Sequence, residues 1–279
     1  MIGRLAGRLY GALAAPFGMR ALERMLRDGL ADSLGPPLRF LFTGQAAPEV
    51  LALAERIEAR RAAIASRGGE YRTLTGPVLS SQRLANSVSV PRRWGVFLHL
   101  CARQFHARAI VELGACAGIS GAYLASAPSR PRFVTIEGSP SLVPVAEEML
   151  ASFNATIIGA PFDAGLPRAL TLVDSVDVAY IDGHHDEAPT LHYVRTLVPH
   201  LSPRALLILD DIRLYDGMRR AWRALSSMSG VSTAVDTGRF GLLVWEGGAA
   251  VPRHYDLARY TGIWRTQQRR AATAMPRAG

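Results

Sequence analysis

From residue 108 onward, short β-rich runs alternate with helical patterns, and this alternation restricts the possible folds more than any other feature of the chain. The β-rich runs cover residues 109–113, 133–136, 156–158, 176–181 and 205–209. The helical patterns between them cover residues 118–127, 141–153, 189–201 and 217–228. Strands separated by helices in this way pair in parallel, and helices then cover both faces of the sheet.

The end of this region follows a different pattern. Residues 231–236 and 240–246 are both β-rich, and only Thr237, Gly238 and Arg239 separate them. So short a connection predicts an antiparallel hairpin. The sequence therefore predicts an α/β, Rossmann-like fold with a seven-stranded, mostly parallel sheet, an antiparallel C-terminal hairpin and helices on both faces.

The first 80 residues are predicted to be helical, because apolar residues such as Leu22, Leu26 and Leu30 recur at helical spacing. Gly68 and Gly69 end the second helical pattern. Residues 73–90 lack periodicity and suggest a connecting or lid loop, and Pro91 opens a further helix. We therefore divide the chain into an N-terminal helical extension or lid (1–87), the α/β domain (88–250) and a basic C-terminal tail (251–279).

The net charge of +9 comes from a chain whose 32 basic residues are all arginine. We attribute this to a coding bias, since the arginines form no long basic block. Cys101 and Cys116 have neither metal-binding spacing nor a disulfide framework, which fits a reducing cytoplasm. No apolar run reaches the ~20 residues that a membrane span needs. Arg4 and Arg8 lie in an amphipathic first helix, where membrane contact is an alternative.

The stretch IVELGACAGISGAYLA (residues 110–125) follows the first predicted strand. Gly114 and Gly118 allow a ligand to approach the backbone closely. Glu112 would repel a phosphate there but suits a ligand that carries an amine. The second strand also ends in an acid, Glu137, at the position that commonly binds ribose hydroxyls. A ligand with an amine and a ribose but no phosphate is S-adenosylmethionine.

Over residues 88–247 the chain resembles class I S-adenosylmethionine-dependent methyltransferases, with ELGACAGIS and VTIEGSP similar to the first two motifs of catechol-type O-methyltransferases. In this family an acid usually follows strand three near the adenine. Here Ala160 and Pro161 stand where Gly-Asp is expected, so Phe162 and Asp163 are the candidates for that role. The resemblance implies cofactor contacts for Glu112, Gly114, Ala115, Cys116, Gly118, Ser120, Glu137, Gly138, Phe162, Asp163 and Asp182.

Three further acids follow two later strands: Asp182, Asp210 and Asp211. Carboxylates that converge at one edge of a sheet repel each other, and a divalent cation such as Mg²⁺ relieves the repulsion. The resemblance extends to metal-dependent O-methyltransferases, whose ligands stand at these positions. The sequence therefore predicts a magnesium site, although Asp211 as a simple helix cap stays open.

The spacing Asp182-x-x-His185 resembles macrolide-sugar O-methyltransferases, in which the histidine is the general base. Catechol-type enzymes have a lysine at that offset, and this chain contains no lysine. We therefore predict that His185, with Asp182, removes the acceptor's proton. The alternative is a loop histidine that only hydrogen-bonds a carboxylate. The neighbouring His184 is a second candidate.

The predicted function is methyl transfer from S-adenosylmethionine to a hydroxyl of a small molecule, such as a sugar or phenol of secondary metabolism. One alternative is a metal-independent methyltransferase that acts on N or C. The other is a non-catalytic cofactor-binding or membrane-docked scaffold. A nucleic acid is not expected as substrate, because IDGHH replaces the Asn-Pro-Pro-aromatic type of motif used for base amines. A homo-oligomer is expected.

Overall fold

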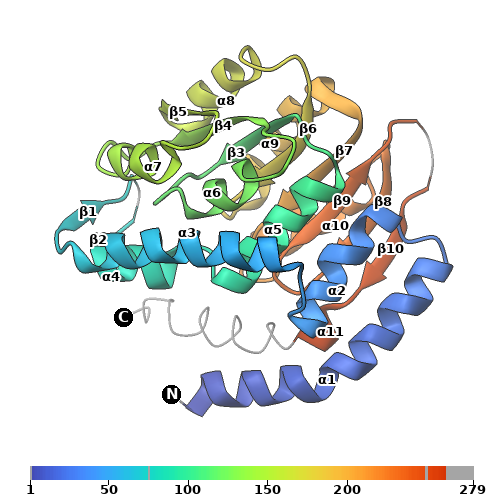
Figure 1. The fold of residues 1–279 in the computed structure, drawn as a ribbon. Coiled ribbons are helices and arrows are strands. Elements are labelled where there is room, and N and C mark those ends of the chain that lie inside the picture. The colour runs from blue at the N-terminus through green and yellow to red at the C-terminus, as the bar shows by residue number, and fades with distance from the viewer. Residues whose placement is uncertain (1, 75, 249–250, 262–279) are drawn as a thin grey trace, which may run out of the picture. The chain divides into compact units, whose positions relative to one another are not determined.

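A computed structural model describes residues 2–74, 76–248 and 251–261, without the side chains of residues 2–13 (Figure 1). The chain divides into two compact units. The first, which we call the glycine-loop unit, comprises Gly44–Tyr180 and Thr196–Ser202. The second, the hairpin unit, comprises Met1–Thr43, Ile181–Arg195 and Pro203–Gly279.

The glycine-loop unit is built on strands in the order β6-β3-β4-β5. Their bounds are Ala109–Leu113 for β3, Arg132–Glu137 for β4, Ala155–Gly159 for β5 and Val176–Ile181 for β6. β4 pairs in parallel with both β3 and β5. All six residues of β6 are buried, as expected for a parallel strand that is covered on both faces. Each predicted strand of this unit is therefore confirmed.

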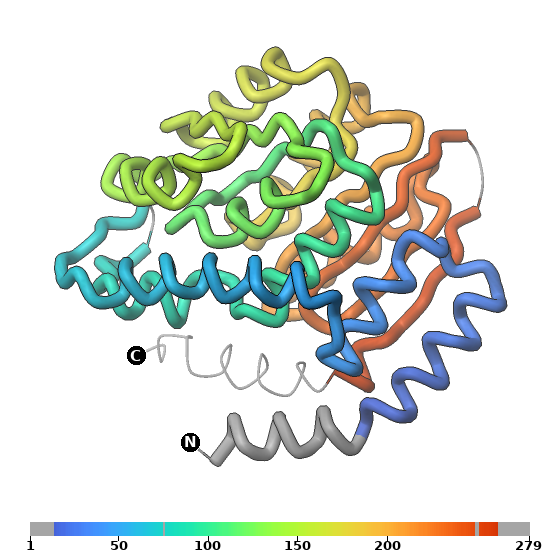
Figure 2. The backbone as a smooth tube through the Cα atoms, in the orientation of Figure 1, coloured from blue at the N-terminus to red at the C-terminus, as the bar shows by residue number. Residues whose placement is uncertain are grey.

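Helices connect and cover these strands, as Figure 2 shows along the backbone. They are α3 (Pro48–Ser66), α5 (Arg92–Gln104), α6 (Ile119–Ala125), α7 (Val143–Leu150) and α8 (Phe162–Leu170). α6 and α8 contact both β3 and β4. The bulky apolar residues Phe97, Phe133 and Tyr123 are fully buried among them. Burial of such side chains is the main favourable contribution to the stability of this unit.

The predicted loop over residues 73–90 is partly wrong. The structure places an antiparallel pair there, β1 (Glu70–Arg72) with β2 (Val78–Ser80), followed by α4 (Ser81–Arg83) and a π-helical turn (Leu84–Val88). Strands of three residues are too short to show periodicity. Arg61 of α3 fixes the segment after α4, because its buried guanidinium donates to the carbonyls of Ala85 and Val90 over 2.6 Å each.

The hairpin unit contains strands in the order β10-β8-β9-β7. Their bounds are Leu201–Leu209 for β7, Val231–Asp236 for β8, Gly241–Trp245 for β9 and Arg253–Asp256 for β10. The predicted hairpin is confirmed, because β8 and β9 are antiparallel with Asp236 opposite Gly241. β10 adds a strand to the seven that the sequence predicts, and it pairs in parallel with β8. Its four residues lie in the segment that the sequence analysis assigned to the basic C-terminal tail.

The remaining elements of the hairpin unit are helical. They are α1 (Ile2–Arg27), η1 (Asp32–Leu34), α2 (Gly35–Thr43), α9 (Glu187–Leu197), α10 (Asp216–Ser226) and α11 (Ala258–Thr261). The short helix η3 (Val198–His200), which follows α9 along the chain, belongs to the glycine-loop unit. The mostly parallel sheet with helices, the antiparallel hairpin and the N-terminal helices together confirm the predicted Rossmann-like fold class.

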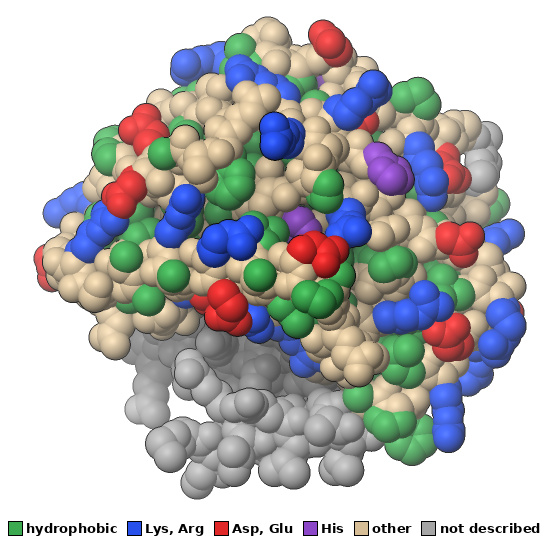
Figure 3. All heavy atoms as spheres, viewed as in Figure 1, with side chains coloured by type: hydrophobic (Ala, Val, Ile, Leu, Met, Phe, Trp, Pro, Cys, Tyr) green, Lys and Arg blue, Asp and Glu red, His purple; other side chains and the backbone are tan. Residues whose placement is uncertain are grey.

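Among the described residues, no helix combines the length and the apolar character that crossing a bilayer requires. The predicted membrane-facing side chains Arg4 and Arg8 lie outside the described side chains, and so does most of the basic tail. On the face drawn in Figure 3, arginines and acidic side chains are interspersed and form no continuous basic patch. The predicted three-part division of the chain stays a prediction.

Candidate cofactor and active site

The loop between β3 and α6 turns sharply through residues with positive φ. Gly114 has a φ of 104°, Cys116 of 49° and Gly118 of 73°. The backbone N–H groups of Gly114 and Ala115 donate to the carbonyl of Ile136 over 3.0 and 3.2 Å, which ties the loop to the end of β4. A Cβ on Gly118 would lie 3.1 Å from the Cα of Ala146. Only glycine fits this position, both for its backbone conformation and for the space available.

Glu137, at the end of β4, is fixed by backbone donors. Its Oε2 accepts the N–H of Cys116 over 2.8 Å, and its Oε1 accepts the N–H of Ser139 over 2.7 Å. The residue is only 7% exposed. Each carboxylate oxygen keeps a further lone pair. The carboxylate is therefore held in one orientation and can still accept hydrogen bonds from two hydroxyls of a ribose.

Glu112, in β3, is completely buried. Its Oε2 accepts the hydroxyl of Thr135 over 2.7 Å, but within the described part of the chain its Oε1 has no hydrogen-bond partner. Burial raises the pKa of Glu112 to about 7, although the nearby hydroxyls of Ser120 and Thr135 act in the opposite direction. Buried polar atoms without a partner are rare in proteins and call for a specific explanation.

A cationic ligand would supply that explanation. Because Glu112 has no exposed surface, the ammonium group of S-adenosylmethionine would act on it through its positive charge, which favours the ionised carboxylate. The glycine loop, Glu112 and Glu137 belong to one unit and are linked by the hydrogen bonds described above. These residues fit the amine and ribose parts of the cofactor.

The other predicted cofactor contacts are less defined by the structure. Ala115 and Ser120 are buried, whereas Gly138 is partly exposed. The N–H of Ala160 donates to the carbonyl of Glu137 over 3.0 Å, so β5 ends beside β4. Phe162 is half-buried and Asp163 exposed in the first turn of α8, a helix that the sequence reading did not identify. Their roles at the adenine stay a prediction.

Asp182 and His185 lie in contact just after β6. His185 Nε2 is 3.5 Å from Asp182 Oδ1, and the two side chains are 28% and 25% exposed. The turn between them is tight, because His184 and His185 have φ values of 58° and 44°. His184 instead points to α9, where its Nδ1 lies 2.6 Å from the hydroxyl of Tyr193. Of the two candidate bases, His185 is the one paired with the carboxylate.

Asp210, at the end of β7, is the most enclosed of the three predicted metal ligands. Its backbone N–H donates to the carbonyl of Ile181, so β6 and β7 end side by side at this point. The carboxylate is 1% exposed and forms a bidentate ion pair with Arg239: Nε to Oδ1 over 2.9 Å and Nη2 to Oδ2 over 2.7 Å. Oδ1 also accepts the N–H of Asp211 over 2.7 Å.

This arrangement does not fit a magnesium ion, because the donors of Arg239 and Asp211 occupy the oxygens that would bind it. Across residues 2–74, 76–248 and 251–261, no group of three or more His, Cys, Asp or Glu side chains is placed to hold a metal. The predicted magnesium site is therefore not confirmed. The sequence analysis considered only the acids and missed Arg239, although this residue stands in the short hairpin turn that it had identified.

Comparisons with known proteins agree with a methyltransferase fold and cofactor site. Residues 111–212 match a family described as a methyltransferase domain. A catechol O-methyltransferase from Niastella koreensis is 28% identical to the chain over 167 residues, which is 54% of this chain and 74% of the relative.

Solved structures share the fold. An O-methyltransferase from Bacillus cereus in complex with SAH has a TM-score of 0.52 and 21% identity, covering 69% of this chain and 89% of its own. The O-methyltransferase TomG from Streptomyces achromogenes, in complex with SAM, has a TM-score of 0.51 and 22% identity, covering 73% and 92%. Taken with the glycine loop and the two strand-end glutamates, the domain match and the relative indicate that the chain is an S-adenosylmethionine-dependent methyltransferase that is similar to O-methyltransferases.

Proposed function

We propose that the chain transfers a methyl group from S-adenosylmethionine to a hydroxyl of a small molecule, with His185 as general base. The observation that carries this proposal is the contact between His185 and Asp182. A histidine paired with a carboxylate is the usual arrangement for removing a proton from a hydroxyl near neutral pH. The bound cofactor supplies an electrophilic methyl group on a sulfonium centre.

The residues of the glycine loop would hold this cofactor. Gly114 and Gly118 let the backbone approach it, Glu112 faces its ammonium group, and Glu137 accepts its ribose hydroxyls. Phe162 and Asp163 are proposed to contact the adenine. Binding of this kind orients the methyl group toward the acceptor, and orientation is one of the largest contributions an enzyme makes to such a displacement.

His185 and Asp182 would act on the acceptor. A carboxylate beside Nε2 favours the tautomer in which Nε2 carries the proton, so Nδ1 is left to accept the acceptor's proton. As the oxygen–methyl bond forms, the methyl–sulfur bond breaks and the proton passes to His185. Asp182 stabilises the imidazolium that results. The products are a methyl ether and S-adenosylhomocysteine.

The acceptor class is proposed from the relative. A catechol O-methyltransferase is among the similar proteins, so a phenol is the first acceptor to test, and a sugar hydroxyl is the second. We also propose a cytoplasmic location and a homo-oligomer, as the sequence predicted.

The proposed base is tested by His185→Ala, with His200→Ala as the control, since His200 is exposed at the end of a short helix. Loss of a general base lowers kcat by about 10²–10⁴-fold. We expect this loss in His185→Ala at neutral pH, with partial recovery as the pH rises and the acceptor ionises by itself. His200→Ala should keep its rate and its pH profile. Equal rates in both variants would refute the role of His185, while cofactor binding without turnover on any acceptor would favour the scaffold alternative.

A further inference from the structure

The ion pair between Arg239 and Asp210 lies where the sequence predicts a metal. Asp210 accepts two hydrogen bonds from the guanidinium of Arg239 and one from the backbone N–H of Asp211. A carboxylate offers about four lone-pair positions in all. A divalent cation that took Asp210 as a ligand would compete with Arg239, because the guanidinium already engages both carboxylate oxygens and at most about one lone-pair position remains.

The turn that carries Arg239 is held on both sides. The N–H of Ile212 donates to the carbonyl of Arg239 over 3.1 Å, and the side chain of Thr237 bonds both the N–H and the carbonyl of Phe240. These bonds fix the backbone on either side of the guanidinium.

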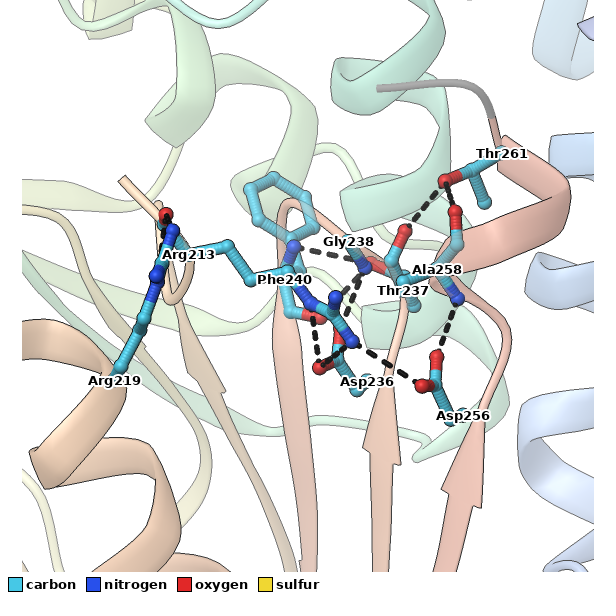
Figure 4. A network of polar contacts seen from close by, with 9 residues as sticks. All are labelled: Arg213, Arg219, Asp236, Thr237, Gly238, Phe240, Asp256, Ala258 and Thr261. Carbon is cyan, nitrogen blue, oxygen red and sulfur yellow. Dashed lines mark hydrogen bonds and ion pairs between the residues drawn. The ribbon is translucent and has the colours of Figure 1, made fainter. Parts of the chain in front are cut away.

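A second network supports the same turn (Figure 4). Asp236 accepts the N–H of Gly238 over 2.7 Å and pairs with Arg213, which also reaches Asp256 in β10 over 3.2 Å. Thr261 donates to the carbonyl of Thr237 over 2.8 Å. The structure thus positions Arg239 by many contacts, and its side chain, only 14% exposed, has little freedom to leave Asp210.

We propose that Arg239 replaces the divalent cation at the strand-end acids, so that this enzyme has no resident metal there. The guanidinium provides a fixed positive charge beside the carboxylate of Asp210, and arginine does not lose its proton near neutral pH. It therefore removes the electrostatic reason for recruiting Mg²⁺, which is the repulsion among neighbouring carboxylates. A charge that belongs to the chain cannot be removed by a chelator.

If Arg239 takes the place of the metal, the choice of acceptor changes, and this consequence rests on the proposed function. A metal ion in such a site would bind two neighbouring oxygens of a catechol. Without it, an acceptor needs only one hydroxyl for proton transfer to His185. We therefore expect a simple phenol or a single sugar hydroxyl to be methylated about as well as a catechol.

The test is a titration of Mn²⁺ alone into EDTA-treated protein, followed by the electron paramagnetic resonance signal of free Mn²⁺. We expect weak binding to the wild type and at least roughly tenfold tighter binding to Arg239→Ala, in which Asp210 becomes available beside Asp182 and Asp211. Thermal unfolding gives a second reading, since an ion that binds the folded state raises its melting temperature. Mn²⁺ should raise the melting temperature of Arg239→Ala and not that of the wild type.

Arg39→Ala is the matched control. It also removes an arginine from an ion pair in this unit, but its partner is the single carboxylate of Glu23. It should bind Mn²⁺ no better than the wild type. If Arg239→Ala does not fold, Arg239→Gln takes its place in the same titration.

Two outcomes overturn the proposal. One is stoichiometric binding of Mn²⁺ by the wild type that Asp210→Asn abolishes, and the other is a folded Arg239 variant with no gain in Mn²⁺ affinity. Neither reading uses methyl transfer, so failure of the proposed function would appear separately, as cofactor binding without turnover.

Discussion

Glu112 and Asp210 make an instructive comparison, one from each unit of the chain. Both are acids at or near the end of a buried β-strand, and their exposed fractions are 0% and 1%. Asp210 is met by a guanidinium and a backbone N–H, whereas Glu112 keeps one carboxylate oxygen without a partner in the described structure. The first acid is satisfied within its own chain, and the second has capacity left for a ligand.

The difference shows that a strand-end acid does not reveal its role by position alone. Burying a carboxylate is costly unless hydrogen bonds or an opposite charge compensate for it. Where the chain provides that compensation, the acid belongs to the internal framework. Where it does not, the pKa of the carboxyl rises, as it does for Glu112, and a cationic ligand gains favourable energy by binding there.

The largest effect is expected from removing the partner of the satisfied acid. Arg239→Ala leaves Asp210 buried without its ion pair, and breaking a buried pair in this way costs about 3–5 kcal/mol. Urea denaturation of the metal-free protein measures the free energy of unfolding. A loss below about 1 kcal/mol would mean that Asp210 finds another partner and that the contrast with Glu112 is weaker than it looks.

The unsatisfied acid should make stability depend on pH. The pKa of Glu112 lies at about 7 in the folded protein, against a usual value of 4.5. Between these two pH values the folded state binds a proton that the unfolded state has released. The contribution of Glu112 to the free energy of unfolding is therefore greatest below about pH 4.5 and is lost as the pH rises to about 7. The size is roughly 3 kcal/mol, at 1.36 kcal/mol for each pKa unit.

Glu112→Gln is the control for this pH dependence, because glutamine has the same shape and does not titrate. We expect the free energy of unfolding of the wild type to fall, relative to that of Glu112→Gln, across this pH window. Adding S-adenosylhomocysteine, which carries an ammonium group, should reduce the fall. Parallel curves for the two proteins would show that Glu112 is already compensated in the folded state.

A substitution of Glu137 tests the cofactor site, and its expected effect on free energy is somewhat smaller. Glu137→Gln replaces a charged acceptor of hydroxyl protons by a neutral amide, and hydrogen bonds to charged groups contribute about 1.5–3 kcal/mol. We expect the affinity for S-adenosylhomocysteine to drop by about tenfold to a hundredfold in calorimetric titrations. An unchanged affinity would remove Glu137 from the ribose site and leave it only as the anchor of Cys116 and Ser139.

The smallest effect is expected at an exposed ion pair. Arg92 and Glu55 lie 2.6 Å apart, but their side chains are 42% and 71% exposed. Solvent screens such pairs, so Arg92→Ala should cost less than about 1 kcal/mol. A cost as large as that of Arg239→Ala would show that burial does not explain the difference between the ion pairs of this protein.

Much of the fold was predictable because it depends on regular patterns. The bounds of β3 and β6 agree with the predicted runs, since buried parallel strands leave largely apolar stretches in the sequence. The bounds of β8 also agree, because the short hairpin connection marks its end. The three-residue strands β1 and β2 and the charged strand β10 were missed, because so few residues show no period.

The candidate site was predictable only in part, for a related reason. Glu112 and Gly114 belong to one recognisable motif, and Glu137 belongs to a second one at the end of the next strand. Arg239 lies 29 residues after Asp210, and only the folded hairpin brings the two together. Residue type and spacing predicted three acids at a strand edge, but not the guanidinium that neutralises one of them.

The most direct test of the contrast between Glu112 and Asp210 is one calorimetric experiment. EDTA-treated wild-type protein is titrated first with S-adenosylhomocysteine and then with Mn²⁺. We expect one molecule of S-adenosylhomocysteine to bind per chain, because the glycine loop and Glu112 have capacity for it, and Mn²⁺ to give no stoichiometric binding, because Arg239 already holds Asp210. Stoichiometric binding of Mn²⁺ would contradict the assigned role of Arg239, and the absence of S-adenosylhomocysteine binding would contradict the assigned role of Glu112.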